Sequence, residues 1–176
     1  MENIIIEIKP TPPDYKTYRE FARFSTFWGR KYKFNAIFLW VILTLFIAAN
    51  ITHYSDLVAL ACIWLVWLLA RYFYMPKSWY KSLQPMRPKE TTYRFYEGHV
   101  ETFAIGENYT MSGSYQYKLL TKVYEARTAF YLKMVDGTML IPKNGLEPTQ
   151  IDSLRNNLMN CFGEDFLFCY KVKHEK

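Results

Sequence analysis

The sequence predicts an α+β membrane protein, in which a two-helix transmembrane hairpin is followed by an antiparallel β-sheet domain closed by a C-terminal helix. Three observations predict this class. Two apolar runs, residues 34–51 and 57–74, have 18 residues each. From residue 90, apolar residues recur at every second position, which is typical of strands. After residue 148, they recur at a spacing of three and four, which is typical of a helix.

The two apolar runs are long enough to cross a bilayer. As helices at about 1.5 Å per residue they measure about 27 Å, against a hydrocarbon core of about 30 Å. Their interiors lack charged residues, and Asn50 and Arg71 stand near the ends, where polar tips reach the interface. The alternative is a buried hairpin in a soluble all-α domain. Two full-length runs only five residues apart favour the membrane hairpin, residues 34–74.

The basic residues predict the orientation of the hairpin. Cytoplasmic flanks of membrane helices carry an excess of lysine and arginine. The loop between the runs has neither, whereas Arg30, Lys31 and Lys33 precede the first run and Arg71, Lys77 and Lys81 follow the second. We therefore expect both termini in the cytosol and the loop outside. Aromatic residues stand where a headgroup-level belt is expected: Trp28, Tyr32, Trp79 and Tyr80.

The N-terminal segment, residues 1–33, predicts a strand and an amphipathic helix. Residues 3–9 are rich in isoleucine and end before Pro10, as a short strand does. A lone terminal strand is unstable, so we expect it to fold back onto the C-terminal half. Asp14 is placed to cap a basic, aromatic helix over residues 14–32. That helix either lies at the cytosolic membrane interface or packs on the soluble domain.

Residues 75–89 predict a basic, proline-containing linker on the cytosolic membrane surface. It and the end of the second run supply candidate contacts to lipid headgroups: Arg71, Lys77, Lys81, Arg87 and Lys89. The alternatives are that these charges only set the topology, and that the linker is simply solvated.

Residues 90–163 predict the β domain. Strands at 91–96 and 99–104 flank Glu97-Gly98, a hairpin signal. A third strand carries Tyr109, Tyr115 and Tyr117 on one face, with Met111. This face is either a candidate partner surface or part of the core. Residues 119–126 favour a further strand.

The last hairpin is the clearest in the chain. Asp136-Gly137 suits a type I′ turn between strands at 130–135 and 138–141. That turn places Met134 opposite Met139 and Leu132 opposite Ile141, with Phe130 on the same apolar face.

A single helix closes the domain. It begins near Pro148, carries an apolar stripe and ends at Gly163; the stripe consists of Ile151, Leu154, Leu158 and Phe162. We expect a curved sheet or open barrel plugged by this helix. The tail, residues 164–176, is apolar enough over 166–172 for a further strand or an interface anchor.

No catalytic, cofactor or metal site is expected. The sequence lacks the common nucleotide-binding and hydrolase motifs, and Cys62, Cys161 and Cys169 have no metal-ligand spacing. His53 and His174 lie on opposite sides of the predicted membrane, so they cannot share a site. His99, near Glu97 and Glu101, is the one candidate acid/base cluster, because residues two apart share a strand face. We favour the alternative that these residues form an exposed polar strand face.

Four short segments, in this order, resemble the C-terminal domain of YcxB-like bacterial membrane proteins: Tyr93-Arg94-Phe95-Tyr96, Tyr117 to Glu125 with Thr121-Lys122-Val123-Tyr124-Glu125, Phe130-Tyr131-Leu132, and Leu140-Ile141-Pro142-Lys143. The resemblance implies a pleckstrin-homology-like (PH-like) bent barrel in the cytosol and residence in the bacterial inner membrane. It supplies no catalytic residue. This chain departs from the family in its tail beyond Gly163 and at Tyr117, where members often have tryptophan.

These observations predict a non-catalytic adaptor or regulatory protein whose partners are the bilayer and either a protein or anionic lipid headgroups. The net charge of +6 is explained by topology and lipid attraction, so no nucleic-acid partner is expected. One alternative is an immunity or resistance protein that binds a toxin at the membrane. Another is an uncharacterised membrane enzyme.

Overall fold

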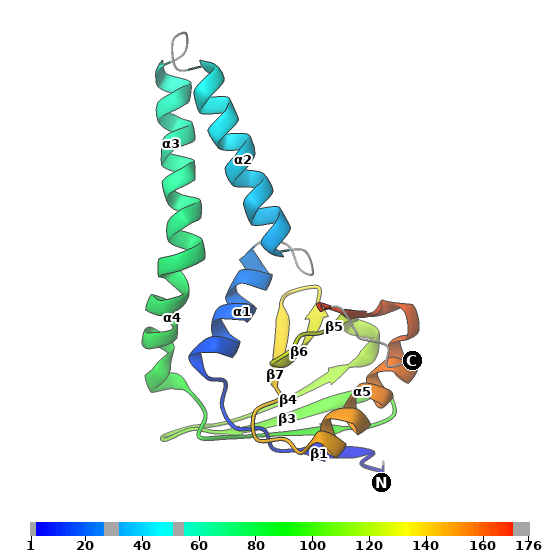
Figure 1. Cartoon of the computed structure of the whole chain (residues 1–176). Coiled ribbons are helices and arrows are strands. Elements are labelled where there is room, and N and C mark those ends of the chain that lie inside the picture. Colours follow the sequence, from blue (N-terminus) through cyan, green and yellow to red (C-terminus); the bar gives the residue numbers. More distant parts are fainter. Residues whose placement is uncertain (1–2, 27–31, 51–54, 171–176) are drawn as a thin grey trace. The chain divides into compact units, whose positions relative to one another are not determined.

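The chain forms two compact units, seen in a computed structural model that describes residues 3–26, 32–50 and 55–170 (Figure 1). The first unit, which we call the β unit, consists of Met1–Thr17 and Gln84–Lys176. Tyr18–Leu83 make up the second, the helical unit. The class is α+β, as predicted.

The helical unit contains two long apolar helices. Helix α2 spans Tyr32–Asn50, and α3 spans Ser55–Leu69. A π-helical turn, Ala70–Tyr74, joins α3 to α4, Met75–Leu83. By length and composition, Lys33–Asn50 and Asp56–Met86 are each able to cross a membrane. The predicted linker, residues 75–89, is largely helical, since α4 is followed by a 3-10 turn, Gln84–Met86.

A proline explains the π-helical turn. Pro76 has no N–H, and its ring would clash with the carbonyl group four residues earlier, that of Tyr72. One extra residue in the turn relieves this clash: the Met75 N–H bonds to the Ala70 carbonyl oxygen, five residues back. The Tyr72 carbonyl oxygen accepts a hydrogen bond from Arg23 Nε instead, at 3.2 Å.

Helix α1 spans Tyr15–Thr26 and begins where the sequence predicts. Asp14 is its N-cap, since Asp14 Oδ1 accepts a bond from the Thr17 N–H at 2.8 Å. Within the helical unit, the rings of Tyr18 and Tyr80 lie 5.7 Å apart, so α1 contacts α4. The predicted continuation through residues 27–31, with Trp28, and the loop with His53 lie outside the described residues.

The first sheet of the β unit has the order β1-β2-β3-β4. Its strands are β1 (Ile6–Ile8), β2 (Glu90–Phe95), β3 (His99–Ile105) and β4 (Thr110–Gln116). All neighbours are antiparallel, and Ile6 pairs with Phe95. The N-terminal strand thus does fold back onto the C-terminal half. It does so because a three-residue strand gains its backbone partners only at the edge of an existing sheet.

The second sheet has the order β7-β6-β5-β8. Its strands are β5 (Leu120–Glu125), β6 (Ala129–Met134), β7 (Thr138–Pro142) and β8 (Phe166–Phe168). Strand β8 lies parallel to β5, so this part of the tail is a strand. Of the two expected forms, a curved sheet or an open barrel, sheets are observed, and no closed barrel is seen among the described strands. Within the described residues the strands form two separate sheets, since the short 3-10 helix Tyr117–Leu119 divides β4 from β5 and these two strands do not pair.

The predicted register of the β6–β7 hairpin is also wrong. Leu132 pairs with Met139 and Phe130 with Ile141. The Met134 N–H donates to the Gly137 carbonyl at 2.8 Å, so Val135 and Asp136 form the turn. Positive φ occurs at Gly145 and Gly163 but not at Gly137. The register differs by two residues, and a shift of two keeps each side chain on its face, so the predicted apolar face survives.

The core of the β unit lies between the two sheets and α5, Pro148–Phe162. The predicted helix stripe is confirmed: Leu154 and Leu158 are fully buried, and Ile151 and Phe162 pack against the same core. Glu147 and Gln150 form a capping box at the start of the helix, with Pro148 in its first turn. Gly163, at φ 49°, ends it.

Candidate functional site

The basic residues predicted to touch lipid divide between the two units. Arg71, Lys77 and Lys81 belong to the helical unit, and Arg87 and Lys89 to the β unit. Lys89 Nζ lies 3.6 Å from Glu107 Oε1, so that charge has an acidic partner. Lys77 and Lys81 are exposed on α4. Of the five residues, only Arg71, Lys77 and Lys81 can therefore be assigned to one basic surface.

Arg71 lies in the π-helical turn among aromatic rings. Its guanidinium carbon is 4.8 Å from the ring centroid of Trp79 and 5.4 Å from that of Trp67. Its Nη1 lies 3.6 Å from the Met75 sulfur, a weak acceptor. Its Nε is buried without a hydrogen-bond partner in the described structure. Cation–π contacts orient such a cation and leave the outer N–H donors of its guanidinium group to bind an anion.

The three tyrosines of the predicted partner face lie in different settings. Tyr115, in β4, and Tyr117, in the 3-10 helix, pack against the core of the β unit. Tyr117 lies 5.4 Å from Phe162, ring to ring, and burial raises the pKa of its hydroxyl. Tyr109 precedes β4, and its hydroxyl donates to the Met86 carbonyl. The structure thus does not present the three as one open surface.

The structure does bring His99 and Glu101 together. His99 Nε2 lies 3.7 Å from Glu101 Oε1, and the Tyr96 hydroxyl donates to Glu101 Oε2 at 3.1 Å. The rings of Tyr96 and His99 stack at 4.4 Å. A shallow groove of about 770 Å³ lies beside His99, bounded also by Ile5 and Gln116. The Glu101 side chain is 43% exposed, so water screens this pair strongly.

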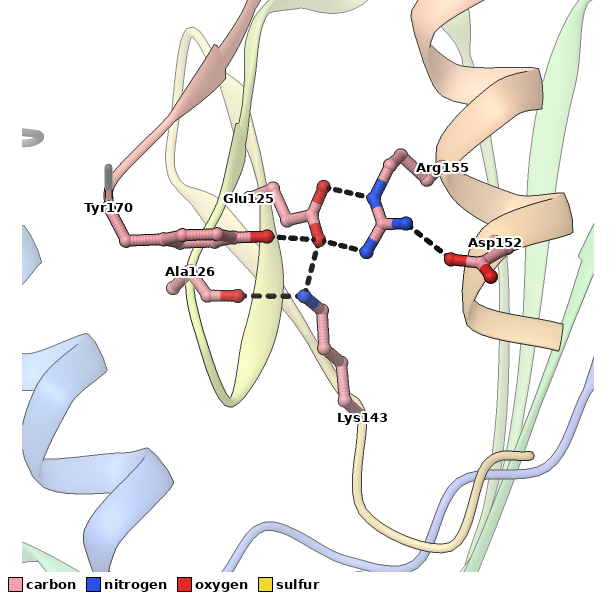
Figure 2. Close-up of polar contacts among 6 residues, drawn as sticks. All are labelled: Glu125, Ala126, Lys143, Asp152, Arg155 and Tyr170. Atoms are coloured by element: carbon pink, nitrogen blue, oxygen red, sulfur yellow. Dashed lines mark hydrogen bonds and ion pairs between the residues drawn. The ribbon is translucent and has the colours of Figure 1, made fainter. Parts of the chain in front are cut away.

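Sequence reasoning missed an extensive polar cluster among the described residues, which is centred on Glu125 (Figure 2). Glu125 is fully buried at the end of β5. Its Oε1 accepts bonds from Lys143 Nζ at 2.6 Å and from Arg155 Nη2 at 2.8 Å, while Oε2 accepts one from Arg155 Nε at 2.8 Å. The Tyr170 hydroxyl donates to Oε1 at 2.8 Å. Arg155 also pairs with Asp152, one turn earlier on α5.

The electrostatics of the cluster keep the carboxylate ionised. Burial raises the pKa of Glu125, but the hydrogen bonds from Arg155 and Lys143 more than offset it, and the net shift is downward. Burial lowers the pKa of Lys143 despite the attraction of Glu125. Burial is the main cause, and the hydrogen bond to Glu125 the second, that raises the pKa of Tyr170 to about 12. A buried carboxylate held charged by two cations is no proton donor at neutral pH.

The Glu125 cluster therefore acts as a structural tie. It joins β5, the segment after β7, helix α5 and the segment after β8, which are distant in sequence. Lys143 Nζ also donates to the Ala126 carbonyl at 2.8 Å and lies 4.5 Å from the Phe130 ring centroid. One signal was available in the sequence: Glu125 ends a predicted apolar strand, where an acidic side chain needs a partner.

No group of His, Cys, Asp and Glu that could hold a metal ion occurs among the described residues. Comparisons with protein-family models, with curated proteins and with solved structures found no match for this chain. The resemblance to YcxB-like proteins therefore stays a prediction.

Proposed function

We propose that this chain is a multi-pass protein of the bacterial inner membrane that carries a non-catalytic binding module on its cytosolic side. The hairpin crosses the bilayer twice, both termini are cytosolic, and the β unit serves an adaptor or regulatory role in the manner of a PH-like domain. Tethering at the membrane raises the local concentration of such a module near membrane partners.

One observation carries the proposal: the two long apolar helices are exposed rather than buried. Only 6% of the Lys33–Asn50 window and 11% of the apolar window in Asp56–Met86 are buried inside the protein. A hairpin in the core of a soluble domain would bury most of these side chains. A contiguous apolar surface of this size needs an apolar surrounding, and the hydrocarbon of a bilayer supplies it.

The non-catalytic role is supported by the chemistry of the β unit. Its buried ionisable cluster is satisfied internally, and the His99–Glu101 pair lies at a shallow, solvent-screened surface. Neither arrangement offers a nucleophile with an adjacent base.

Site-directed labelling tests the proposed topology. In a cysteine-free background, Ser55→Cys places a thiol beside the loop between the apolar runs, and Ser153→Cys places one on the exposed side of α5. A membrane-impermeant maleimide should label Ser55→Cys in intact cells, and Ser153→Cys only after permeabilisation. The reverse pattern, or a chain released from membranes by alkaline carbonate, would contradict the proposal.

A further inference from the structure

The net charge of the protein lies in the helical unit. Residues 18–83 contain eight Lys and Arg but two Asp and Glu, whereas the rest of the chain contains fourteen of each kind. One of the two acidic residues, Asp56, starts α3, at the opposite end of that helix from Arg71. No Asp or Glu stands between residues 57 and 89. The other acidic residue, Glu20, lies in α1. The segment from Arg71 to Lys81 is thus a basic surface that attracts anions.

Within this surface Arg71 has no acidic partner among the described residues. Its contacts are the Trp67 and Trp79 rings and the Met75 sulfur. A guanidinium group carries five N–H donors in a planar fork that matches two oxygens of a phosphate. Among the described residues, one of these donors, on Nη1, has a weak sulfur acceptor, and the Nε–H donor is buried without an acceptor.

Arg23 acts differently, as the residue that holds the turn. Its Nε bonds to the Tyr72 carbonyl oxygen that Pro76 leaves without a helical partner, and its guanidinium carbon lies 3.9 Å from the Tyr72 ring centroid. This bond joins α1 to the π-helical turn next to Arg71. Such turns recur at functional sites, because they re-aim the side chains around them.

We infer that Arg71, set between the indoles of Trp67 and Trp79, binds the phosphate of an anionic phospholipid headgroup, with Lys77 and Lys81 adding positive charge nearby. The inference rests on the proposed membrane location. It assigns to a specific ligand a residue whose charge is otherwise explained by topology alone, and it adds Arg23 as a positioning residue.

The position of Arg71 along the hairpin favours a lipid over a soluble phosphate. Arg71 stands three residues before the end of the apolar run 57–74, so its Cα lies within one helical turn of that end. From there a long side chain reaches the headgroup level. Tryptophan rings prefer the same level. A soluble anion would have to enter this layer against the negative surface of the membrane.

Lipid retention by the purified full-length chain tests the inference. Native mass spectrometry from detergent, after addition of equal phosphatidylglycerol and phosphatidylcholine, should show preferential retention of phosphatidylglycerol. Arg71→Gln should lower that preference about fivefold, the effect of one basic residue near an anionic surface. Lys122→Gln removes the same charge from an exposed position on β5 and should leave the preference unchanged.

Equal losses in the Arg71 and Lys122 variants would overturn the inference, because they would show a general charge effect. Displacement of phosphatidylglycerol by millimolar glycerol phosphate would overturn the lipid assignment. Alkaline carbonate extraction distinguishes a failure of this inference from a failure of the proposed membrane location. A chain that stays in the membrane pellet but shows no lipid preference contradicts this inference alone, whereas a chain that is released contradicts the proposed function.

Discussion

The two units handle their apolar residues in opposite ways. In the β unit, Phe95, Phe130 and Leu154 are fully shielded by their own chain. In the helical unit, Leu45, Ile63 and Val66 are each more than 60% exposed. Apolar surface is stable only away from water. The β unit therefore buries its apolar residues in a core of its own, whereas the hairpin leaves most of its apolar side chains exposed, as a membrane location would require.

The two units also differ in where they place their charged residues. The β unit balances its acidic and basic residues and buries Glu125 with two cations beside it. The helical unit keeps charge out of the interiors of its apolar runs, and its second run carries Arg71 near its end, followed by Lys77 and Lys81. A buried charge needs a partner within the protein, whereas a charge near a bilayer surface finds anionic lipid.

The largest effect is expected where the β unit relies on its internal ion cluster. Glu125→Gln should lower the free energy of unfolding by about 3–5 kcal/mol, because it leaves Lys143 and Arg155 without their charged partner. Denaturant unfolding of the full chain in detergent, followed by near-UV circular dichroism, measures this. Glu107→Gln breaks the exposed pair with Lys89 and should cost about 0–1 kcal/mol. Similar losses in both variants would refute the tie.

The same cluster predicts a dependence on pH. The folded-state pKa of Glu125 lies below its ordinary value of 4.5, so below pH 4.5 the unfolded chain takes up a proton before the folded chain does. The stabilisation by ionised Glu125 is therefore complete above pH 4.5 and is lost as pH falls through the lower folded pKa. The stability difference between wild type and Glu125→Gln should shrink over this acidic range. A constant difference would show that Glu125 does not titrate there.

A matched pair of valines tests whether the two exposed apolar surfaces differ in their surroundings. Val66, in α3, is 65% exposed and Val135, in the β6–β7 turn, is 80% exposed. Val66→Asp should cost about 2.5–3.5 kcal/mol of membrane insertion and reduce the chain recovered in the membrane fraction. Val135→Asp, already in water, should change stability by less than about 0.5 kcal/mol. Equal recovery of both variants from membranes would break the comparison.

A pair of glycines gives the smallest effect and tests how tightly the N-terminal segment is held in the β unit. Gly145 has φ +79°, and a Cβ there would lie 2.7 Å from Thr11 Cγ2. The Thr11 N–H bonds to the Asn144 carbonyl at 2.8 Å. Gly145→Ala should cost about 1–2 kcal/mol in thermal or denaturant unfolding. Gly137→Ala meets nothing within 4 Å and has no positive φ, so it should leave the stability unchanged or raise it by up to about 1 kcal/mol. If Gly145→Ala proves neutral as well, the N-terminal segment is held loosely.

The sequence alone determined those features that follow from a short-range repeat. Apolar runs of 18 residues predicted the long helices, a period of two predicted the strands, and a spacing of three and four with a terminal glycine predicted α5. Each signal is read within one segment, because side-chain direction repeats along a helix or a strand.

The tertiary structure decided what depends on residues far apart in the chain. Glu125 meets residues 18, 30 and 45 positions away, and β8 joins β5 in parallel. In the π-helical turn, the Tyr72 carbonyl oxygen accepts its hydrogen bond from Arg23, which lies 49 residues away. No local period encodes such pairs. A buried carboxylate and an unpartnered carbonyl group each need a donor, and only the folded chain determines which residue supplies it.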